Sequence, residues 1–266
     1  MPKSIVARNR EAWGHFVAYR PLIRELVARD LKVKYRRSFL GYLWSILNPL
    51  LMMVIQTIVF SYMFRSNIDN FPLYLICGNV LYSFFSDSTT IGMDCIVNNA
   101  SLIKKVYIPK FIFPISIVTS RFVMLMLSLL ATVIVMLATG APIHATAALF
   151  WVPLVIMYVL CCGMSLMLSA FTVFFRDLQH IYGVLTMGLM YMTPIFYPLD
   201  SIDPSIQVYV KYNPLYSLIE MFRCFVMYGT APDQFVWINS IGWALGTLLI
   251  GMTVFRKLQK KFILYI

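Results

Sequence analysis

Residues 98–114 read NNASLIKKVYIPKFIFP, a short basic segment that lies between two long hydrophobic stretches. The flanking stretches, 71–91 and 111–138, are each long enough to cross a lipid bilayer, which takes about 20 mostly apolar residues in a helix. The arrangement predicts two antiparallel spanning helices. A short helix at about 99–108 would join them at the membrane surface and face a partner in the cytoplasm.

The composition of the whole chain agrees with a membrane protein. Of the 266 residues, 60% are hydrophobic and only 12% are charged, which excludes an ordinary soluble domain. The predicted fold class is an all-α membrane protein with an N-terminal segment at 1–40, a transmembrane domain at 41–255 and a basic tail at 256–266. Six transmembrane helices are expected, at 43–64, 71–91, 111–138, 147–175, 180–198 and 235–255.

The distribution of lysine and arginine orients these spans. Ten of the 22 lie in residues 1–39, and most of the others lie in 94–110 and in the tail. Because such residues accumulate on the cytoplasmic side, both termini of this multi-pass membrane protein are predicted to be cytoplasmic. The net charge of +11 reflects this asymmetry and an attraction to anionic membrane lipids. No soluble basic domain is present, so nucleic acid is not an expected partner.

The first forty residues are too polar to span the membrane, yet they are patterned. Apolar residues recur at helical spacing from Tyr19 to Leu31, with charged residues mostly on the other face. This pattern predicts an amphipathic helix at the membrane interface. Its basic end, Lys34, Arg36 and Arg37, either binds lipid headgroups or also meets a phosphate-bearing lipid substrate.

The segment before the last span, about 199–230, is long and unusually hydrophobic for a loop. It is predicted to form a re-entrant pair of helices that dip into the outer leaflet, with a turn at Asn213 and Pro214. Glu220 and Arg223 lie three residues apart, so they can pair on one helical face. Such a hairpin could gate an exit.

Two charged residues fall inside predicted spans, where a lone charge costs at least about 2.5 kcal/mol. Asp87 lies in the second span and Arg121 in the third, and the two depths differ by only a few ångströms. A structural ion pair between them is one interpretation. In the other, Arg121 faces a wet pathway and meets the phosphate or hydroxyl groups of a substrate.

Four stretches, in order along the chain, resemble one family. They are RDLKVKYRRSFLGYLWSILNP at 29–49, NNASLIKKVYIPKFIFP at 98–114, FFRDLQHIYGVLTMGLMYMTPIFYP at 174–198 and NPLYSLIEMFR at 213–223. Together they resemble the permease subunits of bacterial ABC exporters for surface polysaccharides and polyol phosphates, such as O-antigen, capsule and teichoic-acid exporters. The resemblance implies a homodimer in the bacterial inner membrane that moves a lipid-linked polysaccharide to the outer face through a pathway between the protomers.

The same resemblance implies a coupling helix, which contacts a separate ABC ATPase subunit, with two such subunits per complex. The expected contacts are Leu102, Ile103, Lys104, Lys105 and Val106, with a second contact at Arg176 and Asp177. The alternative interpretation of the two lysines is the positive-inside rule, and the docking contact is favoured. The sequence has no phosphate-binding Gly-x-x-x-x-Gly-Lys-Ser/Thr loop, so no cofactor is expected on this chain, and ATP and Mg²⁺ would bind the partner.

Sugar rings stack on aromatic side chains, which makes aromatic residues in the spans candidates for the substrate pathway. Tyrosine and tryptophan also gather at membrane interfaces, so each candidate has a second interpretation. The candidates are Trp44, Tyr82, Phe84, Phe85, Tyr191, Phe196 and Tyr197.

Two other functions are considered. One is an ABC permease for a drug or a small lipid. The tyrosine-rich fifth span favours a polymer substrate over such a small substrate. The other is a membrane-embedded glycan-processing enzyme, which is disfavoured because the three histidines fall in separate segments and no catalytic cluster is visible. No metal site is expected, because the five cysteines lack metal-binding spacing and are interpreted as packing residues.

Overall fold

The computed structural model describes residues 19–36, 38–64, 68–106 and 108–265, and within these ranges it contains helices and no strand. Residues 1–18 of the predicted N-terminal segment and Arg37 therefore lie outside the described residues. The α-helices are α2 (Arg20–Tyr35), α3 (Trp44–Phe64), α4 (Phe71–Asn98), α5 (Ala100–Lys105), α6 (Ile112–Thr139), α7 (Trp151–Thr172), α8 (Leu178–Met192), α9 (Pro204–Tyr212), α10 (Pro214–Arg223) and α11 (Gln234–Leu258). Shorter helical turns are η1 (Gly41–Leu43), η2 (Ala145–Leu149), η3 (Leu199–Ser201), η4 (Cys224–Tyr228) and η5 (Gln259–Leu264).

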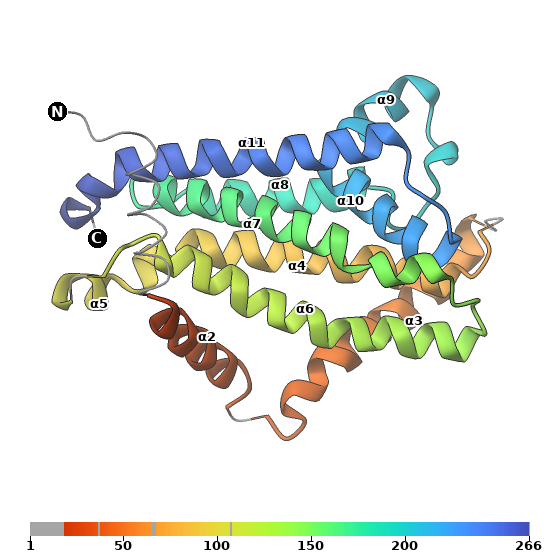
Figure 1. The fold of residues 1–266 in the computed structure, drawn as a ribbon, viewed down its shortest axis with the longest axis horizontal. Coiled ribbons are helices and arrows are strands. Elements are labelled where there is room, and N and C mark those ends of the chain that lie inside the picture. The colour runs from red at the N-terminus through yellow and green to blue at the C-terminus, as the bar shows by residue number, and fades with distance from the viewer. Residues whose placement is uncertain (1–18, 37, 65–67, 107, 266) are drawn as a thin grey trace.

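The long helices α4, α6, α7, α8 and α11 run along one axis of the bundle, as Figure 1 shows. α4 contacts α3, α6, α7 and α8, so it forms the centre of the fold. The short helix α5 and the last turns of α11 lie at one end of the bundle, called the α5 end here, and α9 lies at the other, the α9 end. α2 runs obliquely beside α6 and contacts it, and a turn then leads into α3.

Glycines allow α7 and α11 to pack closely. A Cβ atom at Gly163 would lie 2.4 Å from the backbone of Thr247 and Leu248, and one at Gly251 would lie 2.2 Å from the carbonyl oxygen of Gly163. Small residues at such contacts are typical of helix pairs in membranes, where association depends on close van der Waals packing. This pair therefore forms a rigid side of the bundle.

Four segments are long and apolar enough to cross a membrane: Gly41–Ser61, Ile112–Thr139, Ala145–Thr172 and Gln234–Leu264. Two of the six predicted spans do not meet this criterion. α4 has 28 residues, but its second half carries the polar run SDSTT at 86–90. α8 has 15 residues, about 22 Å at 1.5 Å per residue against a hydrocarbon core of about 30 Å. The chain is thus a multi-pass membrane protein, and the count of six spans stays a prediction.

Three helices agree closely with the predicted spans, and three differ. The helix predicted at 71–91 continues to Asn98 in α4. The helix predicted at 147–175 begins at Trp151, after the 3-10 turn η2. The helix predicted at 180–198 ends at Met192, because Pro194 disfavours helical backbone at Thr193, which is extended. Before the last span, α9 and α10 meet at Asn213, whose side-chain oxygen accepts a hydrogen bond from the backbone of Leu215 at 3.0 Å.

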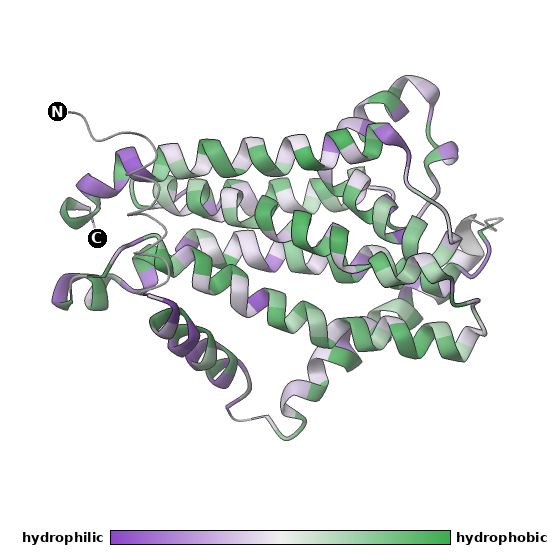
Figure 2. Cartoon of the chain, in the orientation of Figure 1, coloured by the Kyte–Doolittle hydropathy of each residue, from purple (hydrophilic) through white to green (hydrophobic). Residues whose placement is uncertain are grey.

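A second buried cluster lies at the α5 end, apart from the main core of the bundle. It brings together Leu26 of α2, Ile103 of α5, Phe255 of α11 and Phe262 of η5. Lys110 strengthens it, since its Nζ atom donates to the carbonyl oxygen of Gln259 at 2.9 Å. Figure 2 shows hydrophilic residues concentrated on α2, on α5 and on the last turns of α11, whereas α6 and α7 are mostly hydrophobic. Part of the apolar face of α2 therefore packs against protein.

Candidate functional site

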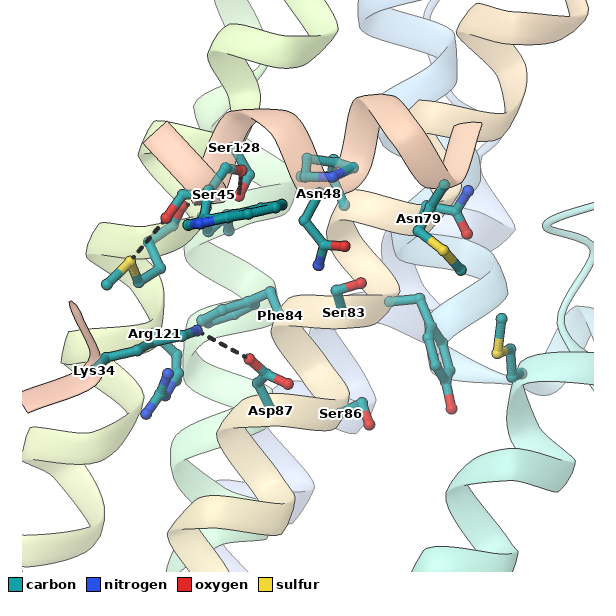
Figure 3. A pocket seen from close by; sticks show the side chains of 18 of the residues that line it. Lys34, Ser45, Asn48, Asn79, Ser83, Phe84, Ser86, Asp87, Arg121 and Ser128 are labelled. Carbon is teal, nitrogen blue, oxygen red and sulfur yellow. Dashed lines mark hydrogen bonds and ion pairs between the residues drawn. The ribbon is translucent and has the colours of Figure 1, made fainter. Parts of the chain in front are cut away.

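A cavity of about 410 Å³ lies between α2, α3, α4 and α6, with Met190 of α8 at its edge. Figure 3 shows that its lining is strongly polar for the interior of a hydrophobic chain. Aromatic side chains form part of its wall. The polar lining residues are Lys34, Ser45, Asn48, Gln56, Asn79, Ser83, Ser86, Asp87, Arg121 and Ser128.

Three charged side chains from three different helices meet at one part of this cavity, called its cationic end here (Figure 3). The Nζ atom of Lys34 lies 3.9 Å from Oδ2 of Asp87, and the two side chains are 38% and 49% exposed. Burial lowers the pKa of Lys34; the positive charge of Arg121 lowers it further, and Asp87 opposes both. The Nε atom of Arg121 is buried and has no hydrogen-bond partner within the described residues.

The ion pair predicted between Asp87 and Arg121 does not form. Both residues line the same cavity, as their similar predicted depths require, but Asp87 pairs with Lys34 of α2. A similar depth along α4 and α6 does not by itself bring two side chains into contact. Lys34 of the third helix, α2, lies closer to Asp87 than Arg121 does. The alternative in which Arg121 faces a polar pathway agrees with its place in the wall.

Three of the seven aromatic candidates line the cavity: Trp44, Tyr82 and Phe84. The hydroxyl group of Tyr82 donates to the carbonyl oxygen of Thr186, which links α4 to α8. Phe84 packs edge to face against Phe122, with ring centroids 5.8 Å apart. The rings are thus held by neighbouring helices.

The other four candidates lie elsewhere. Phe85 is buried in the main core, and Phe196 is buried against Phe60 with ring centroids 5.0 Å apart. Tyr191 is exposed, and the half-buried Tyr197 donates from its hydroxyl group to the carbonyl oxygen of Tyr191. Tyr191, Phe196 and Tyr197 lie at or after the end of α8, and none of the four candidates lines the cavity of Figure 3.

Two of the three basic residues proposed for contact with lipid phosphate lie in the described part of the chain. Lys34 lines the cavity, Arg36 is exposed, and Arg37 is outside the described residues. Sequence reasoning missed the polar residues of α3, although a signal was available. Ser45, Asn48, Met52 and Gln56 recur at intervals of three or four residues, which places them on one helical face.

At the α5 end, the predicted coupling helix is present but shorter than 99–108. Ile103 is 7% exposed and packs into the cluster at the α5 end, and Leu102 packs partly against the same cluster. Lys104, Lys105 and Val106 are exposed. Ile103 therefore faces the bundle, and the expected contact of these residues with an ATPase stays a prediction.

The second predicted contact lies at the same end. Arg176 and Asp177 are exposed at the start of α8. Near them, Nε2 of Gln179 donates to Oδ1 of Asp94 at 2.6 Å, which joins the start of α8 to the last turns of α4. Because α4 leads directly into α5, the two predicted ATPase contacts are connected by this bond.

At the α9 end, Arg223 does not pair with Glu220. The Arg223 side chain is 1% exposed, and its guanidinium group donates to the carbonyl oxygens of Pro194 at 2.8 Å and of Tyr74 at 3.1 Å. The group also lies 3.4 Å from the centre of the Tyr74 ring. Glu220 instead lines a second cavity of about 460 Å³. Spacing on one helix predicted the pair, but carbonyl groups of α4 and of the segment after α8 accept the hydrogen bonds of Arg223.

No group of three or more His, Cys, Asp or Glu residues that could hold a metal ion occurs in the part of the chain that the structure describes. The five cysteines are buried and free. Their positions agree with a packing role.

Comparison with known proteins identifies the family. The family model for ABC-2 type transporters matches residues 21–226. The chain is 34% identical over 246 residues to the O-antigen export system permease protein RfbA of Myxococcus xanthus, covering 92% of this chain and 95% of that protein. It is 32% identical over 248 residues to a protein of the same name from Klebsiella pneumoniae (91% and 93% covered) and 26% identical over 256 residues to the polysialic acid transport protein KpsM of Escherichia coli (92% and 96%). The chain therefore belongs to the ABC-2 type transporter family.

Proposed function

We propose that the chain is the transmembrane subunit of an ATP-driven exporter that moves a lipid-linked polysaccharide across the bacterial inner membrane. The glycan passes from the cytoplasmic to the outer face. In this proposal the chain spans the membrane six times, both termini are cytoplasmic, and the α5 end faces the cytoplasm. The relatives that match this chain over nearly their whole length are named for export of O-antigen and transport of polysialic acid. Their names support a glycan as the cargo.

The observation that carries the proposal is the cavity between α2, α3, α4 and α6. Its wall combines hydroxyl and amide groups with the rings of Trp44, Tyr82 and Phe84. Saccharides present both hydroxyl groups and apolar ring faces, so such a wall offers hydrogen bonds and stacking together. A purely apolar cargo would gain nothing from the polar groups and would leave them without water.

The energy would come from a separate ABC ATPase, which binds ATP and Mg²⁺. Two copies would dock at the α5 end of a permease homodimer, one at each protomer. The docking surface consists of exposed residues at the α5 end: Lys104, Lys105, Val106, Arg176 and Asp177. Their link through Asp94 and Gln179 lets one ATPase movement act on both α5 and α8.

The two ends of the pathway would have different roles. Lys34 in the cavity wall, with Arg36 and Arg37 close to it in the sequence, would attract the phosphate of the lipid carrier, and α2 would lie at the membrane interface. At the α9 end, α9 and α10 would dip into the outer leaflet as a re-entrant hairpin. There Arg223 holds the hairpin to α4, and Glu220 remains available to the outer cavity.

Deletion of the gene in its own bacterium tests the function. The expected result is loss of one surface glycan, seen on gels of the cell envelope, with accumulation of the lipid-linked glycan inside the cell. A plasmid copy should restore export, and so should Lys32→Gln, which alters an exposed lysine of α2 that does not line the cavity. Normal surface glycans in the deletion strain would refute polysaccharide export. Loss of resistance to a drug would favour the small-substrate alternative.

A further inference from the structure

The cationic end of the cavity has a charge pattern that export of a neutral sugar chain does not require. The charged residues in the cavity wall are Lys34, Asp87 and Arg121, so the wall carries one positive charge in excess. They come from α2, α4 and α6, which are far apart in the sequence. We propose that Lys34 and Arg121 form a binding site for a phosphate group, and that Asp87 is the internal anion with which this phosphate competes.

The proposal rests on the proposed function only for the source of the phosphate, which is the carrier lipid. The contact between Lys34 and Asp87 is of a kind that a phosphate can replace. At 3.9 Å, Nζ and Oδ2 are too far apart for a hydrogen bond, and both side chains are partly exposed to solvent. Ion pairs of this kind contribute little to stability. A phosphate has more negative charge than a carboxylate and three acceptor oxygens, so it competes well for the same lysine.

Arg121 provides the second and independent observation. Its Nε–H is buried without an acceptor among the described residues, although buried donors are nearly always paired. A guanidinium group presents several donors in a plane, an arrangement that fits the oxygens of phosphate. Figure 3 shows Lys34, Arg121 and Asp87 directed toward the same region of the cavity. An anion there would accept from Arg121 and from Lys34 together.

Replacement of Asp87 by a phosphate as the partner of Lys34 would also affect α5, the proposed coupling helix. Arg29 lies on α2 five residues before Lys34, and its Nη2 atom lies 3.4 Å from Oδ1 of Asn99, the residue that caps α5. The amide group of Asn99 in turn donates to the carbonyl oxygen of Cys95 at 2.7 Å. A shift of α2 when Lys34 changes its partner thus reaches the surface at which an ATPase would dock.

Binding to the purified full-length permease in detergent tests the site, with farnesyl phosphate and farnesol as probes that differ only in the phosphate. The wild-type protein should bind farnesyl phosphate about tenfold more tightly than farnesol, as one good charged contact would give. Arg121→Gln should remove this difference, and Arg121→Lys should keep part of it. Asp87→Asn should strengthen binding several-fold, because it removes the competing anion. Lys32→Gln is the control and should bind as the wild type does.

The gain from Asp87→Asn is the decisive result, since a damaged fold weakens binding and does not strengthen it. Equal binding of farnesyl phosphate and farnesol, or weaker binding by Asp87→Asn, would overturn the phosphate site. A third arm uses inorganic phosphate. If it displaces farnesyl phosphate at equal concentration, the site takes a free anion, and the lipid-borne source is overturned. A permease that exports glycan in cells but ignores farnesyl phosphate would retain the proposed function and lose this site.

Discussion

Replacing Arg223 with methionine should destabilise the protein strongly, because this arginine holds α10 to the rest of the bundle. Its guanidinium group makes hydrogen bonds of 2.8 Å to Pro194 and 3.1 Å to Tyr74, and Nη2 also lies 3.3 Å from the carbonyl oxygen of Ile195. Methionine fills much of the same volume but donates no hydrogen bond. The substitution therefore removes three hydrogen bonds to buried carbonyl oxygens, although the hydroxyl group of Tyr74 still donates to the carbonyl oxygen of Pro194 at 3.2 Å.

The size of the effect follows from the number and kind of these bonds. A hydrogen bond from a charged donor contributes about 1.5–3 kcal/mol, so the two shorter bonds contribute about 3–6 kcal/mol. The Nε atom of Arg223 is buried and has no partner among the described residues. Removing this buried charge therefore recovers part of the lost free energy. A net loss of about 3 kcal/mol is expected, which lowers Tm by about 6–12 °C for a chain of this size.

Thermal unfolding in detergent measures the change. Arg256→Met is the matched control, because Arg256 is exposed on α11, and its Tm should stay within about 1 °C of wild type. Tyr74→Phe keeps the ring under the guanidinium group but removes the hydroxyl contact to the carbonyl oxygen of Tyr197, and an intermediate loss is expected. A Tm for Arg223→Met equal to that of the control would refute the structural role of Arg223.

Two further predictions concern the α5 end. Val106→Asp should leave Tm within about 1 °C of wild type, because Val106 is exposed, but should weaken co-purification of the ATPase. Ile103→Asp should unfold the α5 end and lower Tm, because Ile103 is buried. Equal effects of the two substitutions on Tm would contradict the assignment of Val106 to the docking surface and of Ile103 to the buried cluster. Phe262→Ala should cost about 3 kcal/mol and lower Tm by about 6–12 °C, since its ring is fully buried against Phe174 and Phe255, and Tyr265→Ala is the exposed comparison on the same turn.

Hydrophobic length alone predicted the long helices well. The spans predicted at 43–64, 111–138 and 235–255 agree closely with α3, α6 and α11, because each is a continuous apolar stretch with polar or glycine-containing ends. The predicted end at 198 was too late, since Pro194 stops α8 and the next residues fold back against the core. The mean hydropathy of an apolar stretch hardly changes with a single proline, so it does not show where the helix ends.

Side-chain partners were much harder to predict than helices. Spacing along one helix suggested Glu220 with Arg223, and depth suggested Asp87 with Arg121, but both arguments leave out elements that are distant in sequence. The actual partners of Arg223 are backbone carbonyl groups, which have no sequence signature. The partner of Asp87 is Lys34, on a helix that was predicted to lie outside the bundle. Only the packing of α2 against α6 brings that lysine to the cavity.

Photo-crosslinking from the cavity tests the central claim, that the exported glycan contacts the cavity between α2, α3, α4 and α6 on its way through the homodimer. A photoreactive phenylalanine analogue replaces Ser83, an exposed residue in the cavity wall, in cells that make the glycan. The account predicts a ladder of glycan-bearing permease on immunoblots after irradiation. The same analogue at Ile241, exposed on α11 outside the cavity, should give none. A ladder from Ile241 and none from Ser83, at equal expression and export, would contradict the account.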